Sequence, residues 1–404
     1  MAGESTIAQM RRVRAIDWLR GLVMVLMTID HAGGLLDAHH LHGDRGAGWV
    51  RGTALPTGEF VTRWITHLCA PAFVLLAGAA LALSVDRRRA QRSPTAFIVA
   101  RGLLIAVLDP LWMSLGFAQY RVLTFQVLYA IGIGLVCMAF LRRLPSWALL
   151  AGACAIQLGG EWLARWLPMP FDAAGHFDGT LWQRPISYLA SALLFNGGPL
   201  HPRIHAFCSY PLLPWLSMMM LGWVLGRWLL RTRAQPPVWR ARRLAGVGGG
   251  LLAGFAVVRA WNQYGNWGLP RDSLAPLQWL HVAKYPPSLA YTTLELGLAF
   301  LLLALFVALD NDANPGDPGT AAQARPWLAP LGVLGASAFF FYLLHVHLLA
   351  AAAHVLSLLN IDRTTHGLAK TYLGAAAALL VLFPLCVRYR RYKAAHPDGW
   401  TRFV

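Results

Sequence analysis

The sequence predicts an all-α fold: a polytopic membrane helix bundle of about ten transmembrane helices plus a short re-entrant or interfacial helix. Of the 404 residues, 57% are hydrophobic and 13% are charged, whereas soluble domains average about 25% charged residues. Mean hydropathy is +0.48, and apolar runs of about 18 residues or more recur along the chain. Because no extended polar segment divides these runs, we expect residues 1–404 to form a single membrane domain.

Ten apolar runs, each bounded by Pro, Gly or charged residues, are long enough to cross a bilayer. They are residues 16–36, 60–84, 97–117, 120–141, 146–167, 210–229, 243–261, 286–309, 330–352 and 368–388. Residues 186–196 are also apolar, but they are too few to span and therefore predict the re-entrant or interfacial helix. Residues 310–329 are rich in Gly, Pro and Asp and predict a cytoplasmic linker within the domain.

Basic residues fall in short runs between the predicted spans, and the formal net charge is +17. These runs are residues 10–14, 86–92, 141–143, 231–243 and 388–393. With a cytoplasmic N-terminus and alternating spans, every run lies in the cytoplasm, as the positive-inside rule requires. We therefore expect an integral membrane protein with both termini in the cytoplasm, whose basic runs contact anionic membrane lipids. The dispersed charge excludes nucleic-acid binding, which needs one contiguous basic face.

The first predicted span carries a polar stripe, and ionisable residues inside a membrane are costly enough to indicate a function. At about 100° per residue, the stripe gathers on one helix face over about 21 Å. It comprises Asp17, Arg20, Met24, Met27 and His31. Asp17 and Arg20 are either an interfacial i,i+3 ion pair or the start of a polar path through the bundle. Asp30 points about 100° away from His31 on an ideal helix, but a helix end at the glycines 33–34 would let the two side chains converge.

The second span opens with Glu59, Arg63 and His67 at i, i+4 and i+8, which places all three on one helix face. Pro71 follows and is expected to kink or reset the helix. Alternation of the spans puts His67 near the extracytoplasmic boundary, where it is either an interfacial histidine or part of a site. Asp109, which precedes a proline within the third span, is either a buried hydrogen-bonded carboxylate or a site residue.

The ninth span contains His345 about 22 Å from its cytoplasmic start, again in the extracytoplasmic half. His345 and His347 lie about 200° apart on a helix, so they cannot bind one metal ion. Two histidine-rich segments elsewhere lack Cys or carboxylate partners at ligand spacing, and no metal site is predicted. His31, His67 and His345 thus reach a similar depth, which predicts a reaction site near the outer leaflet.

Five segments carry distinctive patterns, of which the first-span pattern, "LCAPAFVLLAG" and "KYPPSL" are the most specific. The segments are residues 14–33, 56–78, 209–226, 284–297 and 339–349. Together they resemble bacterial membrane proteins grouped with heparan-alpha-glucosaminide N-acetyltransferase. The resemblance implies an acyltransferase of the bacterial inner membrane that uses cytosolic acetyl-CoA as its co-substrate. The acetyl (acyl) group would pass to an amine or hydroxyl of a sugar or glycan on the extracytoplasmic side.

The resemblance also implies which residues act as the base. His31 falls where the human enzyme carries an asparagine near the reaction centre, and Thr57 falls opposite its proposed catalytic histidine. Because Thr57 cannot replace an imidazole as base, we expect the base to be His31, oriented by Asp30, or His67. Thr57 is then expected to contact the acceptor.

Further residues receive binding roles under the same resemblance. His67 and His345 would bind the acceptor or stabilise the developing oxyanion, and Arg63 is also expected to bind the acceptor. Arg20, with Asp17 beside it, and Arg101 near the start of the third span are expected to meet the CoA phosphates.

The alternative function is a proton-coupled transporter or exporter of an envelope sugar or lipid, with the histidines as a proton relay. The sequence shows no internal repeat, which disfavours transporter folds built from two related halves. An inactive family member acting as a scaffold would also fit the change at Thr57. The oligomeric state stays open between a monomer and a homodimer.

Overall fold

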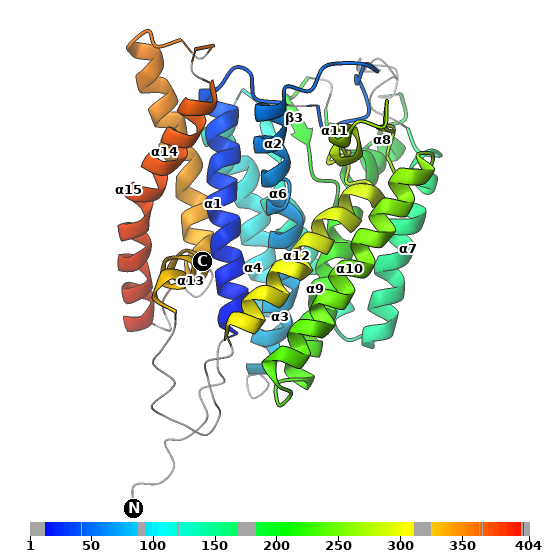
Figure 1. Cartoon of the computed structure of the whole chain (residues 1–404), viewed down its shortest axis with the longest axis vertical. Helices are drawn as coiled ribbons and strands as arrows, with labels where there is room; N and C mark the ends of the chain where they lie inside the picture. Colours follow the sequence, from blue (N-terminus) through cyan, green and yellow to red (C-terminus); the bar gives the residue numbers. More distant parts are fainter. Residues whose placement is uncertain are drawn as a thin grey trace, which may run out of the picture.

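The computed structural model describes residues 13–41, 43–87, 94–118, 121–168, 183–201, 203–310, 325–362, 364–365, 367–396 and 399. The long helices lie side by side in one bundle, and the chain passes from one end of the bundle to the other along each of them (Figure 1). The all-α fold expected from the sequence is therefore confirmed. Most of the predicted linker 310–329 lies outside the described residues, as do large parts of the basic runs 10–14 and 86–92.

Nine of the ten predicted spans coincide with one helix or with consecutive helices, whereas in the predicted span 120–141 the helix begins only at Val127, because residues 123–125 form a strand. The helices are α1 (Arg14–Leu36), α2 (Thr57–Thr66), α3 (Cys69–Arg87), α4 (Pro94–Leu108), α5 (Ser114–Ala118), α6 (Val127–Leu141), α7 (Ser146–Ala164), α9 (Leu212–Arg231), α10 (Pro237–Trp261), α12 (Leu289–Leu309), α13 (Ala329–Ala336), α14 (Ala338–Leu358) and α15 (Gly367–Ala395). Among the described residues, eight helical segments are long and apolar enough to cross a membrane. The segments α6 and α7 fall short in length or hydropathy, so the predicted number of spans is approximate.

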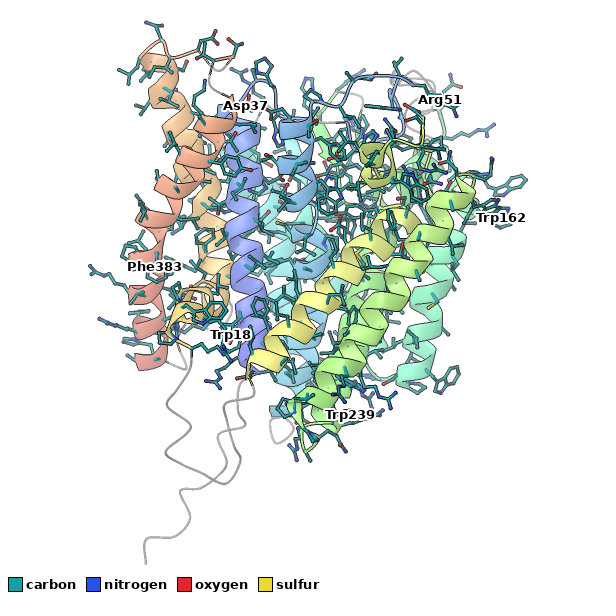
Figure 2. The ribbon with its side chains drawn as sticks, viewed as in Figure 1. Trp18, Asp37, Arg51, Trp162, Trp239 and Phe383 are labelled. Atoms are coloured by element: carbon teal, nitrogen blue, oxygen red, sulfur yellow. The ribbon has the colours of Figure 1, made fainter. Side chains whose placement is uncertain are left out.

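The end of the bundle where α1 ends and α2 begins is called the loop end below, because the connections from α1 to α2 and from α10 to α12 lie there (Figure 1). Figure 2 shows Asp37 and Arg51 at this end and Trp18 and Trp239 toward the opposite end. The short helix α11 (Pro276–Leu280) lies at the loop end. The apolar segment predicted as a short helix forms α8 (Pro185–Ser191) and the π-helical turn η3 (Ala192–Asn196).

A small three-stranded sheet, absent from the predictions, forms from the connection between α5 and α6 and the connection between η3 and α9. The strand β1 (Leu123–Phe125) runs parallel to the central strand β3 (Ala206–Cys208), and β2 (Gly198–Pro199) pairs with β3 in the antiparallel direction. Strands of two or three residues are too short to show the alternation by which a strand is recognised in a sequence.

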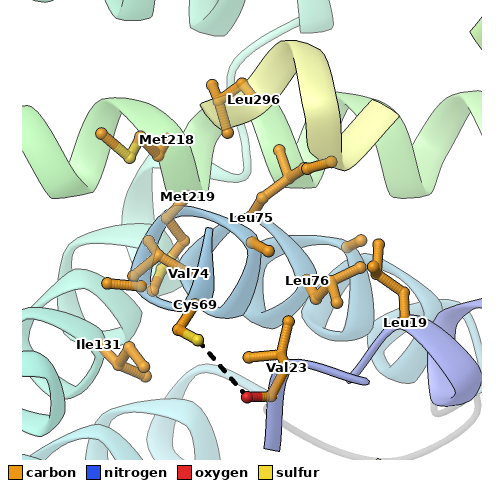
Figure 3. Close-up of a cluster of buried hydrophobic side chains, with 14 of the residues drawn as sticks. Leu19, Val23, Cys69, Val74, Leu75, Leu76, Ile131, Met218, Met219 and Leu296 are labelled. Carbon is orange, nitrogen blue, oxygen red and sulfur yellow. Dashed lines mark hydrogen bonds between the residues drawn. The ribbon is translucent and has the colours of Figure 1, made fainter. Parts of the chain in front are cut away.

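The core is built around α3, which packs against α9 and α1 (Figure 3). Leu75 and Leu76 of α3 and Met218 and Met219 of α9 are fully buried. A Cβ at Gly222 of α9 would lie 2.0 Å from the carbonyl oxygen of Leu75, so only glycine allows this close approach. Such contacts through small residues are typical of membrane helices, because lipid offers little hydrophobic gain from helix association.

The predicted span 60–84 is not one continuous helix, since a turn at His67–Leu68 separates α2 from α3. The physical reason is Pro71, which has no N–H to donate to the carbonyl oxygen of His67 one helical turn earlier. The hydroxyl of Tyr291 on α12 donates to that oxygen instead, at 3.0 Å. The interruption thereby ties α2 and α3 to α12.

The predicted span 97–117 is also irregular, because the π-helix η1 (Asp109–Met113) lies between α4 and α5. Asp109 is fully buried. Its Oδ2 accepts hydrogen bonds from the backbone N–H groups of Gln126 at 2.6 Å and Tyr129 at 2.8 Å. The carboxylate therefore caps the N-terminus of α6 from a neighbouring helix, which favours the structural interpretation of Asp109 over a role in a site.

The contact between Tyr291 and the broken helix gives a stability prediction. Tyr291→Phe is expected to lower the free energy of unfolding by about 1–3 kcal/mol, because the buried carbonyl of His67 loses its partner. Denaturant titration of the purified protein in detergent measures the change. Tyr372→Phe is the matched control, since that hydroxyl bonds to Thr62 at 2.9 Å but its residue is 46% exposed. Equal losses for the two variants would contradict the prediction.

Candidate functional site

A buried polar cluster lies at the loop end between α1, α2, α14 and the connections that follow α1 and α11. Its members carry ionisable or hydroxyl side chains at positions where a membrane bundle is normally apolar. They are Asp30, His31, His40, Asp44, Arg63, Thr66, His67, Lys284 and His345. The structure thus brings together His31, Asp30, Arg63, His67 and His345, all of which the sequence analysis selected.

Arg63 bridges two carboxylates within this cluster. Its Nη1 donates to Oδ1 of Asp30 at 2.5 Å, while Nε donates to Oδ2 of Asp44 at 2.7 Å and Nη2 donates to the same oxygen. Thr66 Oγ1 donates to the same Asp30 oxygen at 2.7 Å. The three side chains of the Arg63 pairs are between 5% and 12% exposed. Two carboxylates in so little water repel each other unless a cation lies between them, and Arg63 supplies it.

Asp44, which the sequence analysis did not select, connects this ion pair to the rest of the site. Its Oδ2 lies 3.2 Å from Nε2 of His67. Burial raises the pKa of the Asp44 carboxyl, but the positive charge of Arg63 and the contact with His67 lower it by more, so the net pKa lies well below the ordinary value. The backbone carbonyl of Asp44 accepts from the N–H groups of Lys284 at 2.9 Å and Tyr285 at 3.2 Å. The Asp44 carboxylate therefore stays ionised at neutral pH. The Asp44 backbone carbonyl holds the "KYPP" segment, which begins at Lys284, against the cluster.

His31 does not pair with Asp30, and the interpretation in which Asp30 orients it is wrong. The Asp30 carboxylate accepts its hydrogen bonds from Arg63 and Thr66. Nδ1 of His31 instead lies 2.6 Å from Nε2 of His345. The expected convergence fails because α1 continues through residues 33–34 to Leu36, so Asp30 and His31 keep their different directions on the helix.

Gly33 has a different role from the helix end expected of it. A Cβ at this position would lie 2.6 Å from Nδ1 of His40. The glycine thus leaves room for His40 to fold back over α1, where its Nε2 lies 3.9 Å from Oδ1 of Asp30. His40 belongs to a histidine-rich segment whose function the sequence analysis left unassigned.

Four predicted site residues lie away from the cluster. Arg20 Nη1 donates to Oδ1 of Asp17 and to the carbonyl of Gly335 on α13, both at 3.2 Å, so the pair joins α1 to α13 near the end opposite the loop end. Arg101 lines a small cavity of about 20 Å³ between α3 and α4. Thr57 is the exposed first residue of α2.

The polar stripe of α1 is not an open channel in this structure. Met24 is fully buried and Met27 is 7% exposed. These side chains fill the stretch between Arg20 and His31, so a ligand can lie along this face of α1 only if they move. Methionine side chains are unbranched and adaptable, which makes such movement inexpensive.

Besides Asp44, the sequence analysis missed two further buried ionisable residues, Lys284 and Glu295. Lys284 is 2% exposed and Glu295 is 1% exposed. Within the described part of the chain, neither carboxylate oxygen of Glu295 has a hydrogen-bond partner. Both could have been found, because Lys284 begins the distinctive "KYPPSL" segment and Glu295 interrupts an apolar run.

A pocket of about 360 Å³ opens at the loop end next to the cluster. Its lining residues are Gly43, Arg45, Ala47, Gly48, Trp49, Ser209 and Tyr285. Arg45 and Tyr285 directly follow Asp44 and Lys284 in the chain, so the pocket adjoins the cluster. Burial lowers the pKa of the Arg45 guanidinium from its ordinary value, because the charge is poorly hydrated there. Two aromatic side chains, two hydroxyls and a guanidinium in one concave site suit a polar ligand such as a sugar.

Among the described residues, no group of three or more His, Cys, Asp or Glu side chains is arranged to hold a metal ion. The cluster is instead rich in groups that move protons or stabilise charge. Imidazoles, a lysine and ion-paired carboxylates in a buried site are suited to proton transfer and to binding a negatively charged intermediate.

Comparison with known proteins agrees with this chemistry. The family model described as heparan-alpha-glucosaminide N-acetyltransferase, catalytic, matches residues 12–250, from α1 into α10. The match includes His31, Arg63 and His67, whereas Lys284 and His345 follow it. A search of curated proteins found no match. Because the family model covers more than half of the chain, the protein belongs to the heparan-alpha-glucosaminide N-acetyltransferase catalytic family, a family of membrane acyltransferases.

Proposed function

We propose that the protein transfers an acetyl group from cytosolic acetyl-CoA to an amine or hydroxyl of a sugar or glycan on the extracytoplasmic side of a bacterial inner membrane, with both termini in the cytoplasm. The observation that carries the proposal is His31, which lies within the family match, inside the membrane bundle and beside a buried cluster of charges. A neutral imidazole with a lone pair on one ring nitrogen can act as a general base.

The proposed reaction needs one proton to move. The acceptor nitrogen or oxygen attacks the thioester carbonyl carbon of acetyl-CoA, and the carbon–sulfur bond breaks. The Nε2 atom of His31 takes the proton of the acceptor and returns it to the departing CoA thiolate. The positive charge of Lys284 stabilises the oxyanion that develops on the carbonyl oxygen.

The two substrates are proposed to approach from opposite ends of the bundle. CoA phosphates bind near Arg20, with Asp17 beside it, and near Arg101, and the pantetheine arm follows α1 for about 21 Å toward His31. Met24 and Met27 must move aside for this arm. The acceptor occupies the loop-end pocket, where Arg45 and Trp49 replace Thr57 as the proposed binding groups.

Reconstituted vesicles test the proposal directly. Protein in sealed vesicles receives acetyl-labelled acetyl-CoA on one side, with glucosamine or glucose on the other. Labelled product on the acceptor side supports transmembrane transfer, and comparison of the two sugars separates transfer to nitrogen from transfer to oxygen. Label that remains entirely on CoA with a range of amino sugars and sugars would refute the proposal.

Ligand binding separates the acyltransferase from a transporter. Acetyl-CoA at about 100 times its dissociation constant is expected to raise the free energy of unfolding by about 2.7 kcal/mol. A rise in the apparent melting temperature of the detergent-purified protein measures this effect, and dephospho-CoA serves as the control for phosphate recognition. An unchanged melting temperature over a wide range of acetyl-CoA concentrations would favour the transporter instead.

A further inference from the structure

We infer that His345 is a positioning residue that fixes the proton of His31 on Nδ1, so that the lone pair of His31 lies on Nε2. The inference rests on the proposed function for its catalytic consequence, but the proton arrangement itself follows from the contacts. His345 lies outside the part of the chain that the family model matches.

The proton on His345 is located by its backbone contacts. Nδ1 of His345 lies 2.8 Å from the carbonyl oxygen of Tyr342 and 3.3 Å from that of Phe341. A carbonyl oxygen can only accept a hydrogen bond, so this nitrogen must carry the hydrogen. A lone pair there would face two oxygen atoms and be repelled by both.

The other nitrogen of His345 is therefore an acceptor when the ring is neutral. The ring is fully buried, and none of the hydrogen bonds or ion pairs of the described residues joins it to a carboxylate. A second proton on His345 would place an uncompensated positive charge in an apolar site, which is strongly unfavourable. The neutral ring with a lone pair on Nε2 is the arrangement that the surroundings permit.

His31 must then donate to His345. The two nitrogens are 2.6 Å apart, the ring centroids are 4.9 Å apart, and the ring planes are inclined by only 20°. Rings joined end to end in nearly one plane have this geometry, and it directs the N–H of one ring along the lone pair of the other. Phe117 packs against His31 with its plane at 87° and further restrains the ring.

The consequence is a chain of fixed proton positions that begins at the backbone of α14. The Tyr342 carbonyl sets the proton of His345, and His345 sets the proton of His31. Nε2 of His31, which has no hydrogen bond to any described residue, is left with its lone pair. In the proposed reaction, this is the atom that takes the proton from the amine or hydroxyl of the acceptor sugar. A partner that holds a histidine in the required tautomer serves the same purpose in catalytic triads.

Two variants of His345 distinguish positioning from packing. His345→Gln places an amide oxygen where Nε2 was, so it still accepts from His31, whereas His345→Leu offers no acceptor. We expect His345→Leu to lower kcat for acetyl transfer by at least about tenfold with little change in KM for acetyl-CoA. We expect His345→Gln to recover most of that loss. Equal kcat values for the two variants would overturn the positioning role.

Solid-state NMR tests the inference without any activity. In protein labelled with ¹⁵N-histidine and reconstituted in lipid, the His31 signals are those lost in His31→Gln. We expect a protonated Nδ1 and an unprotonated Nε2 for His31, and loss of this preference in His345→Leu. A proton on Nε2 in the wild-type protein, or an unchanged preference in His345→Leu, would overturn the inference. Because this readout needs no substrate, its failure is distinguishable from failure of the proposed acetyl transfer.

Discussion

His31→Gln is expected to lower kcat for acetyl transfer by about 10²–10⁴-fold, the usual contribution of a general base. Glutamine is close to histidine in volume and can still donate to His345 through its amide, so the packing around α1 and α14 is preserved. The amide nitrogen has no available lone pair and cannot accept a proton at neutral pH. Initial rates of product formation in the vesicle assay measure the loss.

His347→Gln is the control for this prediction. His347 lies two residues from His345 on α14, but it packs against Trp112 with ring centroids 4.3 Å apart and does not contact His31. His347→Gln should leave kcat within about twofold of the wild-type value, since this half-buried ring has no contact with His31. A wild-type rate for His31→Gln would exclude His31 as the base and direct attention to His67.

Arg63→Met is expected to be the most destabilising single change at the site, lowering the free energy of unfolding by about 3–5 kcal/mol. The substitution removes the cation between the carboxylates of Asp30 and Asp44 while keeping an apolar side chain of similar length. Two buried carboxylates then remain without compensation. Denaturant titration in detergent measures the loss.

The loss of unfolding free energy in Arg63→Met should become smaller as the pH falls. The direction of this pH dependence follows from the protonation of Asp44. In the wild-type protein the pKa of Asp44 in the folded state is lowered. The ion pair of Asp44 therefore stabilises the fold fully at any pH above the pKa of an unfolded aspartate, about 3.9, and this stabilisation is lost only in acid. Without Arg63, burial raises the pKa of that carboxyl, and protonation relieves the repulsion at a higher pH. The two unfolding free energies should therefore approach each other as the pH falls from neutral toward the unfolded pKa of about 3.9.

An ion pair whose guanidinium is exposed, although its carboxylate is buried, provides the control for Arg63. The Arg51 side chain is 77% exposed and its Nε lies 4.0 Å from Oδ1 of Asp272. Arg51→Met should cost less than about 1 kcal/mol, because water and salt screen the exposed guanidinium at its distance of 4.0 Å from the carboxylate. Comparable losses of unfolding free energy for Arg51→Met and Arg63→Met would show that burial of the Arg63 ion pairs does not increase their contribution to stability.

The helices were largely predictable because their signal is local. A run of apolar residues long enough to cross a bilayer identifies itself without any knowledge of its neighbours. Irregularities within the helices were only partly visible. Pro71 predicted an interruption of the second span. The turn at His67–Leu68, however, depends on Tyr291, which lies more than 200 residues away in the chain. The small sheet escaped prediction because its strands have only two or three residues, and because β1 pairs with a distant strand, Leu123 lying opposite Ala206.

The sequence by itself determined that this is a membrane helix bundle of one acyltransferase family, with histidines in three spans near one end. Only the tertiary structure decided which side chains meet there. Asp30 follows its own direction on α1 to Arg63, while His31 reaches His345, a residue 314 positions later. Helical spacing fixes the angle between two neighbours on one helix. The partner that each side chain finds depends on how the helices rotate and pack against one another, and that information lies in contacts between distant segments.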